Sequence, residues 1–176
     1  AQKCECFQKL LRQAAFDALG AAHPQDCRFS NFSLDYYSVQ PLPNGVVPRE
    51  KMAMVKNYCA AYARDFLIDP YRRTAPPSLL FLGNTGLGKT HLSLAILAIA
   101  REVLQKGYGV VYGSAQNLLG KLEKEKFSFN TQDEDQQSYL SLVQECDLLI
   151  LDDLGTEFLS QFVTSMLYNI INTRLL

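Results

Sequence analysis

The residues best suited to chemistry form a glycine-rich run from Gly83 to Thr90. This run fits the pattern G-x-x-x-x-G-K-[ST], which is typical of loops that bind nucleotide phosphates. Glycine lets the main chain turn tightly and brings successive backbone N–H groups within reach of phosphate oxygens. We therefore predict that the whole run binds a nucleotide: Gly83, Asn84, Thr85, Gly86, Leu87, Gly88, Lys89 and Thr90.

The last residues of this run carry the polar side chains that a triphosphate needs. Lys89 would place a mobile positive charge on the β and γ phosphates, and the Thr90 hydroxyl would bind magnesium. A helix that begins at Lys89 would also direct its positive dipole end at the phosphates. The competing interpretation is a glycine-rich turn before a core helix. His91 is a further candidate nucleotide contact, although a solvent-facing position in the first helical turn is the simpler expectation.

A second candidate group is the acid pair Asp152–Asp153, which follows four aliphatic residues, Leu148–Leu151. In open α/β sheets, ligands bind at the carboxyl ends of the strands, where these carboxylates would lie. We predict that Asp152 holds magnesium and that Asp153 is a catalytic residue that polarises the attacking water, with Lys89 as the second catalytic residue. The alternative is a pair of exposed acids in a turn.

The elements that must position these groups alternate between short apolar runs and helical patterns. This order predicts an α/β fold, a three-layer α/β/α sandwich with a parallel sheet. Expected strands are 78–82, 110–114 and 147–151, and expected helices are 2–19, 48–66, 89–106, 115–126, 136–145 and 160–176. Three strands are fewer than a usual sheet contains, so we expect further strands beyond the C-terminus.

Two regions are expected from the composition along the chain. Residues 1–47 read as an N-terminal helix followed by an irregular linker, and residues 48–176 read as the nucleotide-binding core, truncated at its C-terminus. Cys4 and Cys6 could belong to a zinc site, but a structural zinc site needs four ligands and no second pair is present. The remaining cysteines, Cys27, Cys59 and Cys146, are expected to be buried or half-buried apolar residues.

Composition excludes several classes of protein. The 176 residues are 48% hydrophobic and 20% charged, which is enough apolar material for a globular core. The net charge of −1 provides no overall basic field for nucleic acid or anionic membranes. The longest apolar stretch, 92–100, is far below the roughly 18 residues that a membrane span needs. With scattered cysteines and no signal region, we expect a cytoplasmic protein without membrane association.

Three further groups are weaker candidates. The lysines Lys121, Lys124 and Lys126 could contact DNA, but interleaved glutamates favour a solvated helix face. Arg72 and Arg73, beside Tyr71, form a small basic spot with a ring on which a base could stack. The aromatic residues of 29–37 could pack on adenine or dock on the core of the domain.

Beyond the two motifs, longer stretches resemble the bacterial helicase-loader ATPases of the DnaC/DnaI type. These are AAA+ proteins of the initiator group and are similar to the IstB-type transposition helper ATPases. The phosphate loop is generic, whereas Asp152–Glu157 followed by Asn169–Leu175 is much more particular to loaders. The stretches that carry the resemblance are 29–37, 58–63, 79–92, 146–157 and 169–175.

The resemblance implies a P-loop AAA+ ATPase that uses ATP and Mg²⁺ in DNA replication. Its partners would be the hexameric replicative helicase, which it places on single-stranded DNA, and further copies of itself through the AAA+ interface of the full-length protein. The start at Cys4–Phe7 is similar to the cysteine-rich region of some loaders, which implies a zinc remnant. Because the arginine finger, sensor strand and helical lid of the family are absent from this sequence, we expect better ATP binding than hydrolysis.

Two other functions stay open. A transposition helper of the IstB type would polymerise on duplex DNA and make no helicase contact. An adaptor of another class would use ATP only as a structural ligand and would show no steady turnover.

Overall fold

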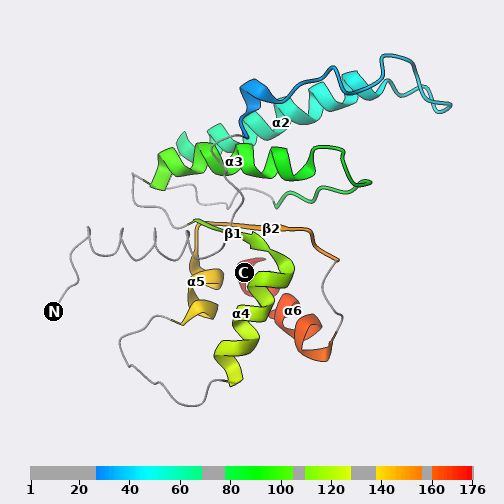
Figure 1. Ribbon diagram of the computed structural model, residues 1–176. Helices are drawn as coiled ribbons and strands as arrows, with labels where there is room; N and C mark the ends of the chain where they lie inside the picture. Colours follow the sequence, from blue (N-terminus) through cyan, green and yellow to red (C-terminus); the bar gives the residue numbers. More distant parts are fainter. Residues whose placement is uncertain (1–26, 69–77, 105–109, 128–137, 156–159, 176) are drawn as a thin grey trace. The chain divides into compact units, whose positions relative to one another are not determined.

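Figure 1 shows the computed structural model, which describes residues 27–68, 78–104, 110–127, 138–155 and 160–175. Chain contacts divide these residues into two compact units. The first unit, up to Val103, contains the 3₁₀-helix η2 (Phe29–Asn31), α2 (Pro48–Ile68) and α3 (Lys89–Leu104). The second unit contains β1 (Val110–Ser114), α4 (Ala115–Phe127), α5 (Tyr139–Glu145), β2 (Leu148–Asp152) and α6 (Gln161–Leu175).

Helix α3 carries most of the buried residues described in the first unit. Six consecutive residues after its first turn, Leu92–Leu97, are buried, and Leu97 is completely inaccessible to solvent. Helix α2 begins at Pro48, where the fixed φ of proline suits a first turn, and buries Cys59 and Ala63. The phosphate-loop run thus precedes a helix that is held in place by its own apolar residues.

The segment before α2 is attached to that helix by basic side chains. Lys56 donates from Nζ to the Phe32 carbonyl at 3.1 Å, and Arg49 donates from Nε to the Tyr37 carbonyl at 3.2 Å. Arg49 also lies 3.4 Å from the Asp35 carboxylate in an ion pair. The irregular chain between η2 and α2 is therefore fixed at several points.

The sheet of the second unit consists of β1 and β2, which run parallel with Val110 opposite Leu148 and Ser114 opposite Asp152. Helices α4, α5 and α6 cover one of its faces (Figure 1). Alternation along the strands directs Val111, Leu149 and Leu151 toward the helices and Tyr112 and Asp152 toward the opposite face. The buried core of this layer comprises Ala115, Leu118, Leu119, Leu122, Val143, Val163 and Ile170.

Two charged side chains join the short helix α5 to its neighbours. The Glu125 carboxylate of α4 accepts hydrogen bonds from the backbone N–H groups of Tyr139 (2.7 Å) and Leu140 (3.3 Å), at the start of α5. At the other end, Arg174 Nη1 donates to the carbonyls of Val143, Gln144 and Cys146. Both ends of α5 leave backbone groups unpaired within the helix, and these side chains satisfy them.

Most of the expected elements are confirmed. The strand at 110–114 and the helices beginning at Pro48, Lys89 and Ala115 agree with the sequence patterns, and β2 is displaced by one residue from the expected strand. Cys59 is buried, while Cys27 and Cys146 are half-buried, as expected. The α/β class with a parallel sheet is therefore confirmed.

Two elements differ from expectation. The structure assigns no strand to 78–82, because a strand needs a hydrogen-bonded neighbour and the described part of the chain contains only the β1–β2 ladder. Leu80 and Leu82 in this run are 71% and 84% exposed. Helix α5 starts at Tyr139 rather than at 136, because Ser138 has an extended ψ of 138°. The expected helix 2–19 lies outside the described residues.

Among the described helices, none is both long and apolar enough to cross a bilayer.

Candidate nucleotide-binding site

The glycines of the phosphate loop adopt the backbone conformations that the motif requires. Gly83, Gly86 and Gly88 have φ values of +152°, +82° and +77°, which side-chain-bearing residues rarely adopt. At Gly86, a Cβ atom would meet nothing within 4 Å, so this turn is open. The sequence therefore places glycine where the chain must bend and where a ligand can approach the backbone.

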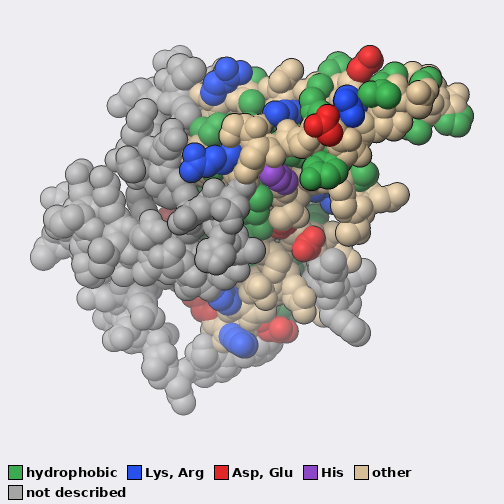
Figure 2. Space-filling model, turned by 45° about the horizontal axis from the view of Figure 1, so that its top comes forward, with side chains coloured by type: hydrophobic (Ala, Val, Ile, Leu, Met, Phe, Trp, Pro, Cys, Tyr) green, Lys and Arg blue, Asp and Glu red, His purple; other side chains and the backbone are tan. Residues whose placement is uncertain are grey.

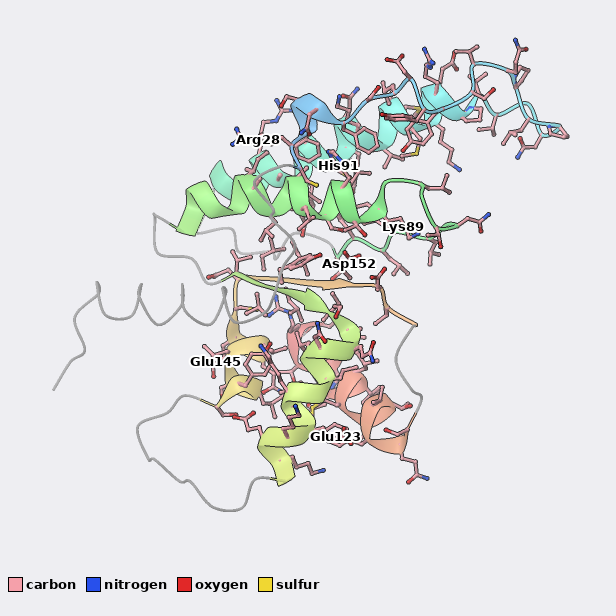
Figure 3. All side chains as sticks on the ribbon, in the orientation of Figure 1. Arg28, Lys89, His91, Glu123, Glu145 and Asp152 are labelled. Carbon is pink, nitrogen blue, oxygen red and sulfur yellow. The ribbon has the colours of Figure 1, made fainter. Side chains whose placement is uncertain are left out.

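Lys89 lies over the loop that precedes it. Its Nζ donates to the carbonyl oxygens of Gly83 at 2.9 Å and Asn84 at 2.8 Å, and Figure 3 shows the residue at the start of α3. These two bonds hold the ammonium group beside the loop main chain. A positive charge held in this way suits an anionic ligand.

The start of α3 contributes its own electrostatic field. The first helical hydrogen bond runs from Leu92 N to Gly88 O at 3.0 Å, so the backbone changes from loop to helix at Gly88. The N–H groups of this first turn and the positive end of the helix dipole favour phosphate. The exposed Thr90 lies in this turn, where its hydroxyl could bind a magnesium ion that accompanies the phosphates.

These observations test the fit of a nucleotide to the loop. The open turn at Gly86, the ammonium of Lys89 and the helix N-terminus are three features that each favour the same anion. The loop could therefore hold the phosphates of ATP through its main chain and Lys89. Thr90 and Asp152 belong to different units, so their shared role as magnesium ligands stays a prediction.

His91 is half-buried and its ring is held by a neighbouring segment, whereas the simpler expectation was a fully solvent-facing side chain. Its Nε2 lies 3.0 Å from the Arg28 carbonyl oxygen and 3.1 Å from Asn31 Oδ1, and Figure 3 shows the ring on the side of α3 that faces Arg28. The Phe32 ring meets the imidazole edge-on at a centroid distance of 5.2 Å. The side chain is thus occupied by the segment at η2, and its candidacy as a nucleotide contact stays a prediction.

The aromatic segment 29–37 docks on the phosphate-loop helix. The Tyr37 hydroxyl donates to the Leu87 carbonyl at 3.2 Å, and a Cβ on Gly88 would lie 2.8 Å from Phe32 Cε2. Of the two interpretations of these aromatic residues, the contacts of Phe32 and Tyr37 support docking on the core of the domain. The same segment continues into α2 through the contacts of Arg49 and Lys56.

The acid pair lies at the end of β2 and has two different environments. Asp152 is only 9% exposed, and its carboxylate accepts from the Tyr112 hydroxyl at 2.9 Å and from the Asp153 N–H at 3.0 Å. Asp153 is exposed and has a φ of +52°, an uncommon value for a residue with a side chain. The strand thus delivers one fixed carboxylate and one carboxylate at a strained turn, an arrangement seen at functional sites.

Sequence reasoning missed the residues that support these motifs. Tyr112 sits on β1 two positions before Ser114, the residue opposite Asp152, so strand alternation places it on the same face as the acid. Strand alternation would therefore have identified Tyr112, had the pairing of β1 with β2 been known. Tyr37 carries no comparable signal, because its partner Leu87 lies 50 residues away in an irregular loop.

The lysines of α4 were a weaker candidate for contact with DNA. On α4, Glu123, Lys124, Glu125 and Lys126 are exposed, as a solvated face predicts. Lys121 and Lys126 extend over the rings of Tyr139 and Phe162. Positive and acidic side chains are interspersed on the face shown in Figure 2.

The other candidates fall in parts of the chain without a described position. Arg72, Arg73, Cys4 and Cys6 lie outside the described residues. Within the described ranges there is no group of three or more histidine, cysteine or acidic residues suited to a metal ion. That search does not include Cys4 and Cys6, so the expected zinc remnant stays a prediction.

Comparison with curated proteins gives three relatives. The chain is 30% identical over 82 residues to the chromosomal replication initiator protein DnaA of Aliarcobacter butzleri, covering 47% of this chain and 16% of that protein. It is 30% identical over 97 residues to a putative insertion sequence ATP-binding protein of Sinorhizobium fredii, covering 55% and 30%. It is 29% identical over 126 residues to the DnaA protein of Helicobacter hepaticus, covering 71% and 26%.

The chain thus spans less than a third of the length of each of these relatives. No solved structure matches the chain significantly. The family described as IstB-like ATP binding protein matches residues 73–175, which include the phosphate loop, the acid pair and every element from α3 to α6. The fold is that of an α/β P-loop NTPase, and the chain belongs to the IstB-like ATP-binding protein family.

Proposed function

We propose that this chain is the ATPase module of a helicase loader, which uses ATP to place the hexameric replicative helicase on single-stranded DNA. The observation that carries the ATP-dependent part is the loop geometry: Lys89 Nζ held by the carbonyls of Gly83 and Asn84, next to glycines with positive φ. A loader needs such a site because nucleotide state must control when the helicase is held and when it is released.

Two observations favour a role in replication. The stretch Asp152–Glu157 followed by Asn169–Leu175 resembles loaders more than other P-loop proteins. Two of the relatives are named chromosomal replication initiator proteins. The partners of the proposed function, namely the helicase, single-stranded DNA and neighbouring copies of the chain, follow from this resemblance.

The chain's own residues would divide the chemistry of hydrolysis among them. Lys89 would balance the charge that develops on the β and γ phosphates, and Thr90 and Asp152 would hold Mg²⁺. Asp153, exposed at the end of β2, would orient and polarise the attacking water. Because aspartate reaches less far than glutamate, we expect slow turnover.

The proposal is tested by complex formation between the full-length protein and the replicative helicase of the same cell. We expect a complex with ATP that is lost with Lys89→Ala, and transfer of the helicase to single-stranded DNA. Lys51→Ala, an exposed lysine on α2, is the matched control and should behave as wild type. A wild-type protein that makes no helicase complex in ATP would contradict the loader assignment.

A transposition helper is the second candidate, and the insertion sequence ATP-binding relative favours it. This alternative predicts ATP-dependent polymerisation on duplex DNA without helicase contact. Negative-stain images of the full-length protein with ATP and duplex DNA would show filaments in that case. A loader would instead form discrete complexes with the helicase.

An adaptor that uses ATP only as a structural ligand is the third candidate. Steady ATP turnover by the full-length protein, abolished by Asp153→Asn, would eliminate it. Asp147→Asn, in the residue before β2, serves as the control because it changes an acid at the opposite end of the same strand.

A further inference from the structure

We propose that residues 28–37, called the brace, position the phosphate loop, with Tyr37 and His91 as positioning residues that set its affinity for nucleoside triphosphate. The proposal deepens the nucleotide-binding function proposed above and rests on it. It assigns a role to the aromatic segment that the motifs do not cover.

The first contact orients a peptide group of the loop. The Tyr37 hydroxyl donates to the Leu87 carbonyl oxygen at 3.2 Å. Because the peptide between Leu87 and Gly88 is trans and planar, its C=O and N–H point in opposite directions. By holding the carbonyl on its own side, Tyr37 turns the Gly88 N–H away from the brace. Backbone N–H groups of such a loop are the donors that bind phosphate, so this bond fixes the direction of one of them.

The second contact is steric and falls on the same peptide. A Cβ on Gly88 would lie 2.8 Å from Phe32 Cε2 and 3.0 Å from the Tyr37 hydroxyl. The brace therefore packs directly against the loop main chain at Gly88. Only glycine leaves room for this approach, so the last glycine of the motif serves the brace as well as the turn.

The third contact holds the first turn of α3. His91 Nε2 lies near two oxygens, those of the Arg28 backbone and the Asn31 side chain. Asn31 Oδ1 also accepts a bond from Arg28 N at 2.8 Å, which identifies this atom as the amide oxygen. Since both neighbours are acceptors, Nε2 carries the proton and donates. His91, which directly follows Thr90, thus attaches the brace to the first turn of α3.

The brace is itself anchored to α2. Lys56 and Arg49 of α2 donate to the carbonyls of Phe32 and Tyr37, the two aromatic residues that meet the loop. The orientation of the loop therefore depends on a segment that is tied to a second helix. A bound triphosphate would gain from this order, because the loop need not be arranged at the moment of binding.

The test is a titration of the full chain with a fluorescent ATP analogue. Tyr37→Phe removes only the hydroxyl, and loss of one neutral hydrogen bond corresponds to about fivefold weaker binding. Tyr36→Phe is the matched control: this neighbouring side chain is 90% exposed, and the affinity of the variant should equal that of the wild type. Equal affinity of Tyr37→Phe and wild type would overturn the proposal.

Variants at His91 separate positioning from simple packing. His91→Gln keeps an N–H donor for the Arg28 carbonyl and should bind within about twofold of wild type, whereas His91→Leu should bind about fivefold more weakly. Thermal midpoints of the variants, measured without nucleotide, separate loss of fold from loss of affinity. If glutamine and leucine lower the affinity equally, the donor has no role and the proposal is wrong.

Failure of the brace and failure of the nucleotide site give different results. If Lys89→Ala abolishes binding while Tyr37→Phe and His91→Leu do not change it, the nucleotide site stands and the brace is refuted. If the wild-type chain does not bind the analogue at all, both proposals are refuted together.

Discussion

The phosphate loop and the acid pair are supported in opposite ways. The loop depends on residues far away in sequence: Tyr37 reaches Leu87 across 50 positions, and His91 reaches Arg28 across 63. The acid pair depends on the register of two adjacent strands, which brings Tyr112 of β1 to Asp152 of β2. A binding loop without regular structure therefore needs specific tertiary contacts, whereas a strand positions its side chains by alternation.

The greatest loss of stability is expected at Gly88, where the loop meets the brace. Gly88→Ala forces a residue with a Cβ into a φ of +77° and places that Cβ 2.8 Å from the Phe32 ring. Together, backbone strain and overpacking should lower the free energy of unfolding by about 3 kcal/mol. Denaturant unfolding measures this loss.

Gly45→Ala is the matched control for that change. Gly45 has nearly the same φ, +79°, but a Cβ there would meet nothing within 4 Å. It should lose only the backbone term, about 1 kcal/mol. Equal losses at the two positions would show that contact with the brace adds nothing.

In the second unit, the strongest destabilisation is expected at Arg174. Its Nη1 donates to three carbonyls at the end of α5, with the shortest bond, 2.7 Å, to Cys146 just before β2 begins. Arg174→Met leaves these carbonyls without the donor and should cost about 2 kcal/mol in unfolding free energy. Arg64→Met, which removes one bond from an exposed arginine to its own helix, should change stability by under about 0.5 kcal/mol.

A smaller effect, with opposite signs, is expected at two tyrosines of the second unit. Tyr112→Phe removes the donor to the buried Asp152 carboxylate and should destabilise the fold by about 1 kcal/mol. The Tyr139 hydroxyl is buried without a hydrogen-bond partner in the described structure, so Tyr139→Phe should be neutral or stabilising. Denaturant unfolding of both variants measures the difference.

The same environment perturbs the ionisation of Tyr139. Burial, followed by the charges of Cys146 and Glu125, raises the pKa of Tyr139 to about 12, so its hydroxyl stays protonated at neutral pH.

Equal losses of unfolding free energy in Tyr139→Phe and Tyr112→Phe would contradict the prediction for these two tyrosines. The hydrogen bond from Tyr112 to Asp152 would then add nothing to the stability of the fold.

The sequence patterns predicted those parts of the fold whose causes are local. The start of α2 follows from the fixed φ of proline at position 48, and β2 follows from the apolar run that ends in Asp152. The phosphate loop follows from glycines that tolerate positive φ. These three features were therefore predictable. The run 78–82 has the composition of a strand, but a strand exists only with a hydrogen-bonded neighbour, which composition does not specify.

The side chains that hold the site in place could not be predicted, because the sequence does not specify which distant segments meet. Glu125 holds the start of α5 and Tyr37 holds the loop, each through contacts between segments that are distant in sequence. His91 is an example of a contact that the local sequence does not predict. Its position in a first helical turn suggested exposure, and only the folded chain shows that the brace contacts its ring through Arg28, Asn31 and Phe32.

Every functional conclusion depends on the loop from Gly83 to Thr90 binding a nucleoside triphosphate, with Lys89 as its principal cation. The decisive measurement is a titration of the full chain with a fluorescent ATP analogue in Mg²⁺, comparing wild type, Lys89→Ala and Lys51→Ala. We predict saturable binding by the wild type and by Lys51→Ala and its loss in Lys89→Ala. Indistinguishable affinities of all three chains would contradict this assignment.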